Sequence, residues 1–482
     1  METHLYSVII IGAGIAGINA AYRLQSELPD HTYAILEARN AIGGTWDLFR
    51  YPGVRSDSDL FTFGFSWFPW DQHNPIADGV SIANYIRRAA AQHDIDRHVV
   101  FQHRVISYHW SSWSSTDNVW TLLVDNLGQL VLYFTRFIIL ATGYYDYDRP
   151  LDSPIPGLDR FEGLVVQPQF WPAGLDCEGK QIVIIGSGAT AVTLLPCLVE
   201  KAVKVTMLQR SPTYILPMAN KNTRTIADTL FSPRMAHKLK RAKWIITSRL
   251  TVLFCQTSPR FTRWLFRWIV SSRLPPHIPY SPHFDPTYNP WEQRLCICPD
   301  GDFFASLHTG RGDVETGTIQ EVVADGIILD SGKKLDADII VTATGMRLQM
   351  AGGASFYVDD ERYPLPEKYT WNGVMLQDLP NMAMLTGYTN ASWTLGVDAK
   401  MRLVCRLLRS MADHQHSMAV PRVHDGSTLE EKQLLDLKST YIIKGAGILP
   451  RAAKQRPWCP HDNYLSEWLF AKYGSLEGLE MT

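Results

Sequence analysis

The chain has 482 residues, of which 46% are hydrophobic and 20% charged, and its formal net charge is -2. A chain of this length exceeds a single compact core, so two or three domains are expected, and the near-neutral charge argues against nucleic acid as the main partner. The first apolar run begins close to the N-terminus, and no apolar run approaches the ~18 residues of a membrane span, which predicts a cytoplasmic protein.

The first predicted unit is a strand, a glycine turn, a helix and a second strand. The apolar run 7–11 leads into Gly12-Ala13-Gly14-Ile15-Ala16-Gly17, and the second apolar run, 33–36, ends at Glu37. The glycines let backbone N–H groups approach a diphosphate at the helix N-terminus, and a carboxylate at the next strand end accepts hydrogen bonds from a ribose diol. Because Glu37 would repel a 2'-phosphate, this unit is predicted to bind FAD or NAD.

Residues 43–59 form an irregular stretch rich in Gly and Pro, which we expect to carry polar side chains toward the cofactor.

Two later segments share a pattern that indicates how the domains are connected. Residues 137–143 and 339–345 both read as buried strands that end in a turn of small residues. Strands buried on both faces are typical of parallel sheets, and small residues let the chain leave a domain beside a bound cofactor. The second nucleotide domain is therefore expected to be inserted within the first.

A second glycine loop, Gly186-Ser187-Gly188-Ala189-Thr190-Ala191, follows the strand-like run 181–185. The next apolar run, 204–208, ends in Gln209-Arg210-Ser211, where an acid would otherwise stand. The permanent charge of Arg210 favours the extra phosphate of NADPH over NADH. A single glycine turn is weak evidence, because such turns also serve ordinary packing between strand and helix. Here two such turns each follow a strand, and the second strand of one unit ends in Glu37 whereas that of the other ends at Arg210. This combination indicates an enzyme that uses FAD and NADPH together.

Residues 229–284 contain ten Lys and Arg and no Asp or Glu, and aromatic residues are interleaved with these cations. The spacing of Trp264, Leu265, Trp268 and Ile269 suits one face of a helix. Two interpretations stay open for this stretch. It forms either a basic amphipathic surface that touches anionic lipid, which would make the protein a peripheral membrane protein, or a helical subdomain whose aromatic residues line its own core or a substrate pocket.

The predicted fold is α/β, with two Rossmann-like dinucleotide-binding domains and an inserted helical subdomain. Residues 1–150 and 346–482 are assigned to a split FAD-binding domain, 151–214 and 285–345 to an NADPH-binding domain, and 215–284 to the helical insertion. The seven cysteines include no C-x-x-C pair and no completed zinc pattern, so neither a metal site nor a disulfide reductase is expected.

Several longer segments resemble the flavin-dependent Baeyer-Villiger monooxygenases over nearly the whole chain. They are Gly43-Gly44-Thr45-Trp46-Asp47, Tyr51-Pro52-Gly53-Val54-Arg55-Ser56-Asp57, the second glycine loop, and Phe161-Glu162-Gly163 leading to Trp171-Pro172. The segments 43–63, 291–296 and 387–395 are most similar to the ethionamide-activating branch of this family.

This resemblance implies an enzyme that uses NADPH and O2 to insert oxygen next to a ketone carbonyl through a C4a-peroxyflavin, giving an ester or lactone. The expected partners are O2 and a small-molecule ketone, or a thioether if sulfoxidation also occurs. One alternative is a flavin monooxygenase that oxygenates nitrogen or sulfur. Another, from a different class, is a cofactor-binding protein with weak or lost oxygenase activity. No residue pattern in the chain identifies the particular substrate.

The resemblance also assigns roles to individual residues. Arg294 would be the cation beside the flavin, and Asp57 the carboxylate that pairs with it. The contacts carried over from the family are, for FAD, Ala16, Thr45, Trp46, Asp47, Leu48, Asp57 and Val105, and, for NADPH, Arg55, Ser56 and Asp57. The two glycine loops and the strand ends beside them add Gly12, Gly14, Gly17 and Glu37 for FAD, and Gly186, Ser187, Gly188, Ala189, Thr190, Ala191, Gln209 and Arg210 for NADPH.

The chain departs from the diagnostic motif of the family, F-x-G-x-x-x-H-x-x-x-W-P, at one position. Phe161, Gly163, Trp171 and Pro172 match the motif, and Gln167 stands where the histidine is expected. Glutamine donates and accepts hydrogen bonds as neutral imidazole does, but it takes up no proton near neutral pH. If the histidine only orients the linker, Gln167 suffices; if its titration matters, flavin reduction or coupling is impaired. This departure motivates the second alternative.

Overall fold

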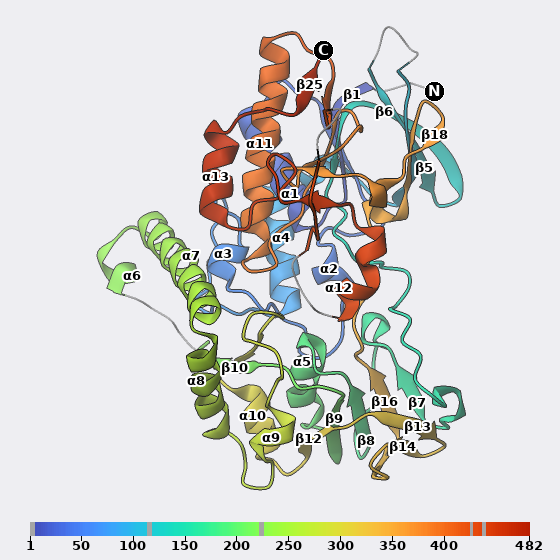
Figure 1. The fold of residues 1–482 in the computed structure, drawn as a ribbon, viewed down its shortest axis with the longest axis vertical. Helices are drawn as coiled ribbons and strands as arrows, with labels where there is room; N and C mark the ends of the chain where they lie inside the picture. The colour runs from blue at the N-terminus through green and yellow to red at the C-terminus, as the bar shows by residue number, and fades with distance from the viewer. Residues whose placement is uncertain (1–4, 113–117, 221–225, 425–427, 436–439) are drawn as a thin grey trace.

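The computed structural model describes residues 5–112, 118–220, 226–424, 428–435 and 440–482. Within them lie two main β-sheets, one in the upper and one in the lower half of the molecule in Figure 1. Each contains a run of parallel strands and is covered by helices, so the predicted α/β class is confirmed. No helix among the described residues is long and apolar enough to cross a membrane.

The first sheet is built around β1 (Leu5–Ile11), which pairs in parallel with β2 (Tyr33–Leu36) on one side and β6 (Gln129–Leu140) on the other. The sheet continues past β2 to β3 (Val99–Val100). Beyond β6 lie, in order, β5 (Trp120–Asn126), β4 (His103–Trp110), β17 (Ser355–Val358) and β18 (Glu361–Arg362), and β21 (Met382–Met384) also pairs with β6. Strands from both ends of the sequence therefore form one sheet.

Alternating side chains of β1 enter two separate cores. Val8 and Ile10 pack with the helical side, and Ile9 and Ile11 pack with the opposite side of the sheet. The helical side is covered by α1 (Ile15–Glu27), α4 (Gly79–Gln92) and α11 (Trp393–Asp413). Burial on both faces explains why this strand reads as a continuous apolar run rather than as an alternating one.

The second sheet is entirely parallel. Its strands run in the order β12 (Gly312–Thr316), β9 (Lys204–Gln209), β8 (Gln181–Ile185), β16 (Ile339–Thr342) and β7 (Leu164–Val166). One face packs on α5 (Ala189–Leu198) and α10 (Asp302–Leu307). The other face packs on the antiparallel strands β13 (Ile319–Val323), β14 (Gly326–Leu329) and β15 (Lys334–Asp336).

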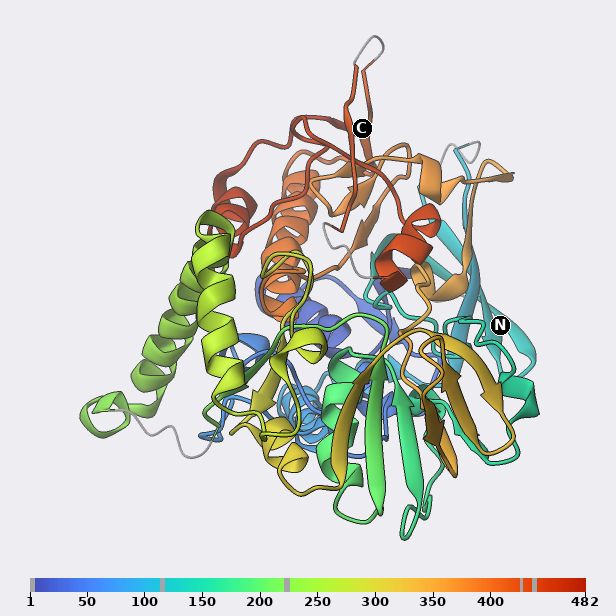
Figure 2. The ribbon, with the colours of Figure 1, turned by 60° about the horizontal axis from the view of Figure 1, so that its bottom comes forward.

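The segment between β9 and β12 carries the helical insertion. Its helices are α6 (Ile226–Leu230), α7 (Pro233–Thr257), α8 (Pro259–Ser271) and α9 (Tyr280–His283), and α7 projects at the left side of the molecule in both Figure 1 and Figure 2. The predicted helical range 215–284 also contains a strand, because β10 (Ile215–Met218) pairs with β11 (Cys296–Pro299). This pairing closes the base of the insertion.

The remaining elements complete the first half of the molecule. Two one-turn helices, α2 (Thr45–Leu48) and α3 (Leu60–Phe63), flank the stretch rich in Gly and Pro. The C-terminal part adds α12 (Thr440–Gly445) and α13 (Tyr464–Tyr473), and α13 packs against α11. Three short strand pairs also lie in this part, namely β19 (Thr370–Trp371) with β20 (Met375–Leu376), β22 (Ala419–Pro421) with β25 (Leu479–Met481), and β23 (Glu431–Lys432) with β24 (Ala452–Ala453).

Candidate functional site

The two sheets share one cavity of about 1280 Å³. The carboxyl ends of β1 and β8 and the turns that follow β6 and β16 all line it. Ligands of open α/β sheets bind outside the carboxyl ends of parallel strands, and sites for a single drug-sized molecule measure ~300–1,000 Å³. The cavity is therefore in the expected place and is larger than one small ligand requires.

The first glycine loop holds the chain close to a neighbouring strand. Gly12 has a φ of +102°, and a Cβ at this position would lie 2.8 Å from the Ala141 carbonyl oxygen. Helix α1 then begins at Ile15 without a side-chain cap. An uncapped helix N-terminus offers backbone N–H groups and a partial positive charge to an anion. This end of the cavity is suited to a diphosphate.

Glu37 lies beside that loop and is buried. Its carboxylate accepts hydrogen bonds from the backbone N–H groups of Ala13 at 2.7 Å and Arg39 at 2.8 Å. Burial raises the pKa of Glu37, and these two bonds partly oppose the shift. The carboxylate is held rigidly at the cavity wall, where it can receive hydroxyl groups and would repel a phosphate.

The second glycine loop repeats the arrangement at β8 and α5. Gly186 has a φ of +139°, and a Cβ there would lie 2.2 Å from the Ala343 carbonyl oxygen, whereas a Cβ at Gly188 would meet nothing within 4 Å. Helix α5 starts at Ala189 without a side-chain cap. Arg210 is exposed and lines the cavity just past β9. Ser187 ties the loop to this strand end, because its hydroxyl donates to the Ser211 carbonyl oxygen at 3.1 Å.

Between the two loops, Ser56 presents a buried polar atom to the cavity. The residue is only 3% exposed, lines the cavity, and its Oγ has no hydrogen-bond partner among the described residues. A buried hydroxyl without a partner is costly, so a ligand that pairs with it would be stabilised. Neighbouring Arg55 also lines the cavity and forms an ion pair with Asp302. Together with the two uncapped helices, this orphaned hydroxyl indicates that the chain fits two dinucleotides.

Arg294 and Asp57 meet in the same cavity although 237 residues separate them. The guanidinium contacts the carboxylate twice, with Nε at 2.9 Å from Oδ2 and Nη2 at 3.1 Å from Oδ1. Nη2 also donates to the Ser58 hydroxyl at 3.3 Å. A two-point contact fixes the plane of a guanidinium as well as its position. The side chains are 36% and 32% exposed, so the pair remains accessible from the cavity.

Gln167 follows β7 at the edge of the second sheet. Its Oε1 accepts a hydrogen bond from the Thr342 hydroxyl at 3.0 Å, and both residues line the cavity. The residues that match the motif do not line the cavity. Phe161 packs in the core between the second sheet and β13–β15, and Trp171 packs against the core on the side of α5 and α10. A Cβ on Gly163 would collide with the Asp338 carbonyl oxygen. Pro172 is exposed. Among the defined positions of the motif, Gln167 is thus the one whose side chain reaches the site, and Pro168 and Gln169 at its variable positions line the cavity beside it.

Most of the predicted cofactor residues line the cavity, and four do not. Those that line it are Gly12, Gly14, Ala16, Glu37, Thr45, Trp46, Leu48, Arg55, Ser56, Asp57, Val105, Gly186, Ser187, Gly188, Ala189, Thr190 and Arg210. Gly17 and Ala191 instead pack their helices against the strands, since a Cβ on Gly17 would lie 1.9 Å from the Gly12 carbonyl oxygen and Ala191 is fully buried.

Gln209 and Asp47 point into the protein instead of into the cavity, although the sequence predicts cofactor contacts for both. Successive residues of a strand face opposite ways, so Gln209 turns inward where Arg210 turns outward. The Gln209 side-chain amide donates to the His283 carbonyl oxygen at 2.6 Å. Asp47 is buried and binds three arginines, including Arg39 at 2.6 Å. Asp47 therefore contacts the cavity wall only indirectly, because it holds Arg39, which lines the cavity.

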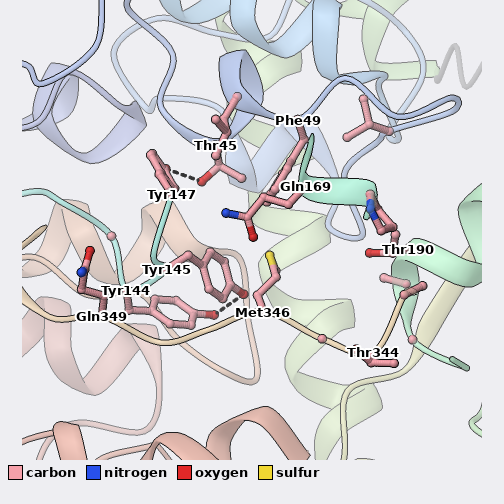
Figure 3. A pocket seen from close by; sticks show the side chains of 18 of the residues that line it. Thr45, Phe49, Tyr144, Tyr145, Tyr147, Gln169, Thr190, Thr344, Met346 and Gln349 are labelled. Carbon is pink, nitrogen blue, oxygen red and sulfur yellow. Dashed lines mark hydrogen bonds between the residues drawn. The ribbon is translucent and has the colours of Figure 1, made fainter. Parts of the chain in front are cut away.

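The cavity wall also contains side chains that the sequence does not single out, namely Phe49, Tyr144, Tyr145, Tyr147, Gln169, Thr344, Met346 and Gln349. Figure 3 shows Thr45, Phe49, Tyr144, Tyr145, Tyr147, Gln169, Thr190, Thr344, Met346 and Gln349 around the cavity. Tyr147 accepts from or donates to the Thr45 hydroxyl at 2.9 Å, and burial raises the pKa of Tyr147 to about 12. Tyr145 donates to Tyr144 at 2.9 Å. The sequence carried a signal for the tyrosines, because three of the four residues after the small-residue turn at Gly143 are tyrosines.

The chain is similar to known proteins over most of its length. Residues 6–351 match the family model described as flavin-binding monooxygenase-like. The chain is 42% identical to the FAD-containing monooxygenase EthA of Mycobacterium tuberculosis (strain ATCC 25618 / H37Rv), over 99% of this chain and 97% of that protein.

Solved structures show the same fold. An oxidized steroid monooxygenase bound to NADP superposes with a TM-score of 0.77 at 20% identity, and a complex of OTEMO with FAD and NADP superposes with a TM-score of 0.74 at 20% identity. Each match covers 99% of both chains.

Proposed function

This chain belongs to the flavin-binding monooxygenase-like family, and from that premise we propose that it is an FAD-containing, NADPH-dependent enzyme that inserts one oxygen atom of O2 beside a ketone carbonyl. The product would be an ester or a lactone. The observation that carries the proposal is the two-point contact between Arg294 and Asp57 inside the cavity that both glycine loops line.

The first glycine loop and Glu37 are proposed to hold FAD. The N-terminus of α1 suits the diphosphate, and the carboxylate of Glu37 suits a ribose diol. Thr45, Trp46, Leu48 and Val105 are proposed to line the rest of this part of the site. When bound, the flavin supplies the redox chemistry, accepting a hydride from NADPH and reacting with O2.

The second glycine loop is proposed to hold NADPH. The N-terminus of α5 suits its diphosphate, and the charge of Arg210 suits its 2'-phosphate. Arg55 and the unpartnered Ser56 hydroxyl are proposed as further contacts. The relatives support this assignment, since a solved structure with the same fold is bound to NADP.

Arg294 is proposed to stabilise negative charge on oxygen during the insertion. Addition of an oxygen nucleophile to a carbonyl gathers negative charge, and arginine remains ionised even where water is scarce. Asp57 holds the guanidinium in one plane. A preorganised charge partner of this kind contributes ~3 kcal/mol, which corresponds to roughly a hundredfold in rate.

The first prediction is that Arg294→Ala still lets NADPH bleach the flavin but lowers ester formation by about a hundredfold or more. Flavin reduction is followed by absorbance without O2, and the ester is quantified by gas chromatography. Arg311→Ala serves as the matched control, because Arg311 is an exposed arginine outside the cavity. Full ester yield from Arg294→Ala would remove Arg294 from the proposed reaction.

The type of oxygenation is tested with the unaltered enzyme. A ketone and a sulfide are supplied in parallel with NADPH and O2, and both products are identified. An ester from the ketone supports the proposal. Sulfoxide without ester would instead assign the enzyme to sulfur oxygenation, and NADPH consumption without either product would favour a cofactor-binding protein that has lost oxygen transfer.

A further inference from the structure

The long helix α7 carries an apolar stripe on its exposed side. Met235, Leu239, Ile246, Leu250 and Leu253 recur at spacings that place them on one helical face, and all are at least 37% exposed. The residues buried on the opposite face include Ala236, His237, Val252 and Cys255. The stripe is therefore directed away from the body of the protein, and α7 projects from that body in both ribbon views (Figures 1 and 2).

Helix α8 extends the same apolar surface. Phe261, Trp264 and Trp268 are 53%, 59% and 62% exposed, while Thr262, Phe266 and Val270 are buried. An aromatic contact joins the two helices, because the ring centroids of Phe254 on α7 and Phe261 on α8 lie 5.9 Å apart. Within α8, the ring centroids of Phe261 and Trp264 lie 5.4 Å apart. We refer to these nine residues as the α7–α8 face: Met235, Leu239, Ile246, Leu250, Leu253, Phe254, Phe261, Trp264 and Trp268.

Positive charge surrounds this face. Arg234, Lys238 and Lys243 are exposed on α7, and Arg260 and Arg267 are exposed on α8. No Asp or Glu occurs between residues 229 and 284 to neutralise them. The cations flank the apolar stripes, so the surface is amphipathic and basic at once.

Two other cations of α7 hold the helix in place. Lys240 forms an ion pair with Asp228 at 2.7 Å. The Arg241 guanidinium donates to the carbonyl oxygens of Phe61 and Gly64, each at 2.8 Å. Because α7 is anchored through these buried contacts, the orientation of its exposed stripe is set by the fold.

We propose that the α7–α8 face docks on the surface of an anionic lipid bilayer. The apolar side chains would enter the boundary between headgroups and acyl chains, and the flanking Lys and Arg would contact the lipid phosphates. Charge complementarity selects this occupant over a second copy of the chain. In a twofold symmetric dimer the face would meet itself, so these exposed cations would oppose identical cations.

The proposal concerns attachment and does not depend on the proposed oxygenation. Docking is measured by co-sedimentation of the flavin-loaded protein with vesicles, read from the flavin colour in the pellet. One vesicle population is an equal mixture of phosphatidylglycerol and phosphatidylcholine, and the other is pure phosphatidylcholine. We expect the protein to pellet with the anionic vesicles and to remain in solution with the neutral ones, and raising the salt concentration should release part of it.

Two variants separate the apolar and the charged contributions. The triple variant Phe261→Ser, Trp264→Ser, Trp268→Ser should lower the partition coefficient by about tenfold or more. The double variant Arg260→Gln, Arg267→Gln should lower it by roughly fivefold per cation. The matched controls are Leu127→Ser, Leu130→Ser, Leu132→Ser on the hairpin between β5 and β6, and Lys180→Gln, Lys201→Gln, all at exposed positions. These should pellet like the parent protein.

Three results would overturn the proposal. The parent protein could stay in solution with anionic vesicles, or the triple serine variant could bind as tightly as the controls. Alternatively, the parent could form dimers that the triple variant abolishes, without vesicle binding, which would make the face an interface between copies. Circular dichroism and flavin content of each variant distinguish a lost surface from a lost fold.

Discussion

Asp57 and Asp59 are close together in the sequence, but their carboxylates have very different surroundings. Asp57 is 32% exposed and faces Arg294, whereas Asp59 is 7% exposed and caps α3. Its carboxylate accepts from the Thr62 backbone N–H at 2.8 Å and from the Thr62 hydroxyl at 2.6 Å. Burial raises the pKa of Asp59 to about 6, and the bonds from Thr62 partly oppose this shift. The same short segment thus supplies an accessible charge and a buried helix cap.

The Asp59 environment predicts a pH dependence of stability. Because the folded-state pKa of about 6 lies above the ordinary value of 3.8, ionisation opposes folding, and stability is lost as pH rises through this window. Asparagine caps helices as well as aspartate does but does not ionise. The stability of Asp59→Asn relative to the parent should therefore increase as the pH rises from about 4 to about 6. Above about pH 6 the difference in unfolding free energy should reach up to ~3 kcal/mol.

The measurement is the thermal midpoint of parent and Asp59→Asn across this pH range. Asp78→Asn is the matched control, because Asp78 caps α4 through the same pair of bonds at an exposed position. An advantage of Asp59→Asn that does not grow with pH, or that Asp78→Asn reproduces, would contradict this account of the buried cap.

Gln167 leads to a second prediction at the residue scale. Its Oε1 accepts from Thr342, and an unprotonated imidazole nitrogen can accept the same bond. Gln167→His should therefore preserve or raise the amount of product formed per NADPH consumed, whereas Gln167→Leu, which lacks an acceptor, should lower it. If Gln167→His loses coupling as strongly as Gln167→Leu, the linker is built around glutamine and the acceptor argument is wrong.

At the scale of elements, glycines at different positions of the two glycine loops serve different purposes. Gly12 and Gly186 adopt positive φ and approach the carbonyl oxygens of neighbouring strands, so a side chain at either position would strain the fold. Gly188 has an ordinary φ of -79° and open space where a Cβ would stand. The first kind of glycine shapes the turn, and the second leaves room at a helix N-terminus.

This difference predicts opposite outcomes for two similar substitutions. Gly188→Ala should leave the thermal midpoint unchanged and raise the KM for NADPH by roughly tenfold or more, because the added methyl group occupies space in front of α5. Gly17→Ala should instead lose flavin and stability, since its Cβ would lie 1.9 Å from a backbone oxygen.

The control for Gly188→Ala is Gly447→Ala, where a Cβ also meets nothing within 4 Å but lies outside the cavity. An unchanged KM for NADPH in Gly188→Ala would mean that the cofactor does not approach this loop. A lowered thermal midpoint would mean that the space at Gly188 is needed by the protein itself.

At the scale of the whole molecule, the site depends on chain connections that cross between the sheets. The chain enters the second sheet after β6 and returns after β16, and the turns at both crossings line the cavity. Asp57 comes from the first half of the molecule, and Arg294 lies two residues before the start of β11 at the base of the insertion. Their contact thus requires both halves to be folded and correctly placed.

The sequence by itself determined the two units of strand, glycine loop and helix, the family, and the parallel sheets. These follow from features of short stretches, such as a turn geometry that only glycine accommodates or an apolar run buried on both faces. The sequence also located the basic, aromatic stretch 229–284, but it left open whether its apolar side chains face inward or outward.

Only the tertiary structure decided which side chains reach the cavity. It turned Gln209 and Asp47 inward, brought Tyr144, Tyr145 and Tyr147 to the cavity wall, and left Trp264 and Trp268 exposed. The physical reason is that the direction of a side chain depends on partners far away along the chain. Packing between sheets and helices selects those partners, and local residue spacing does not encode them.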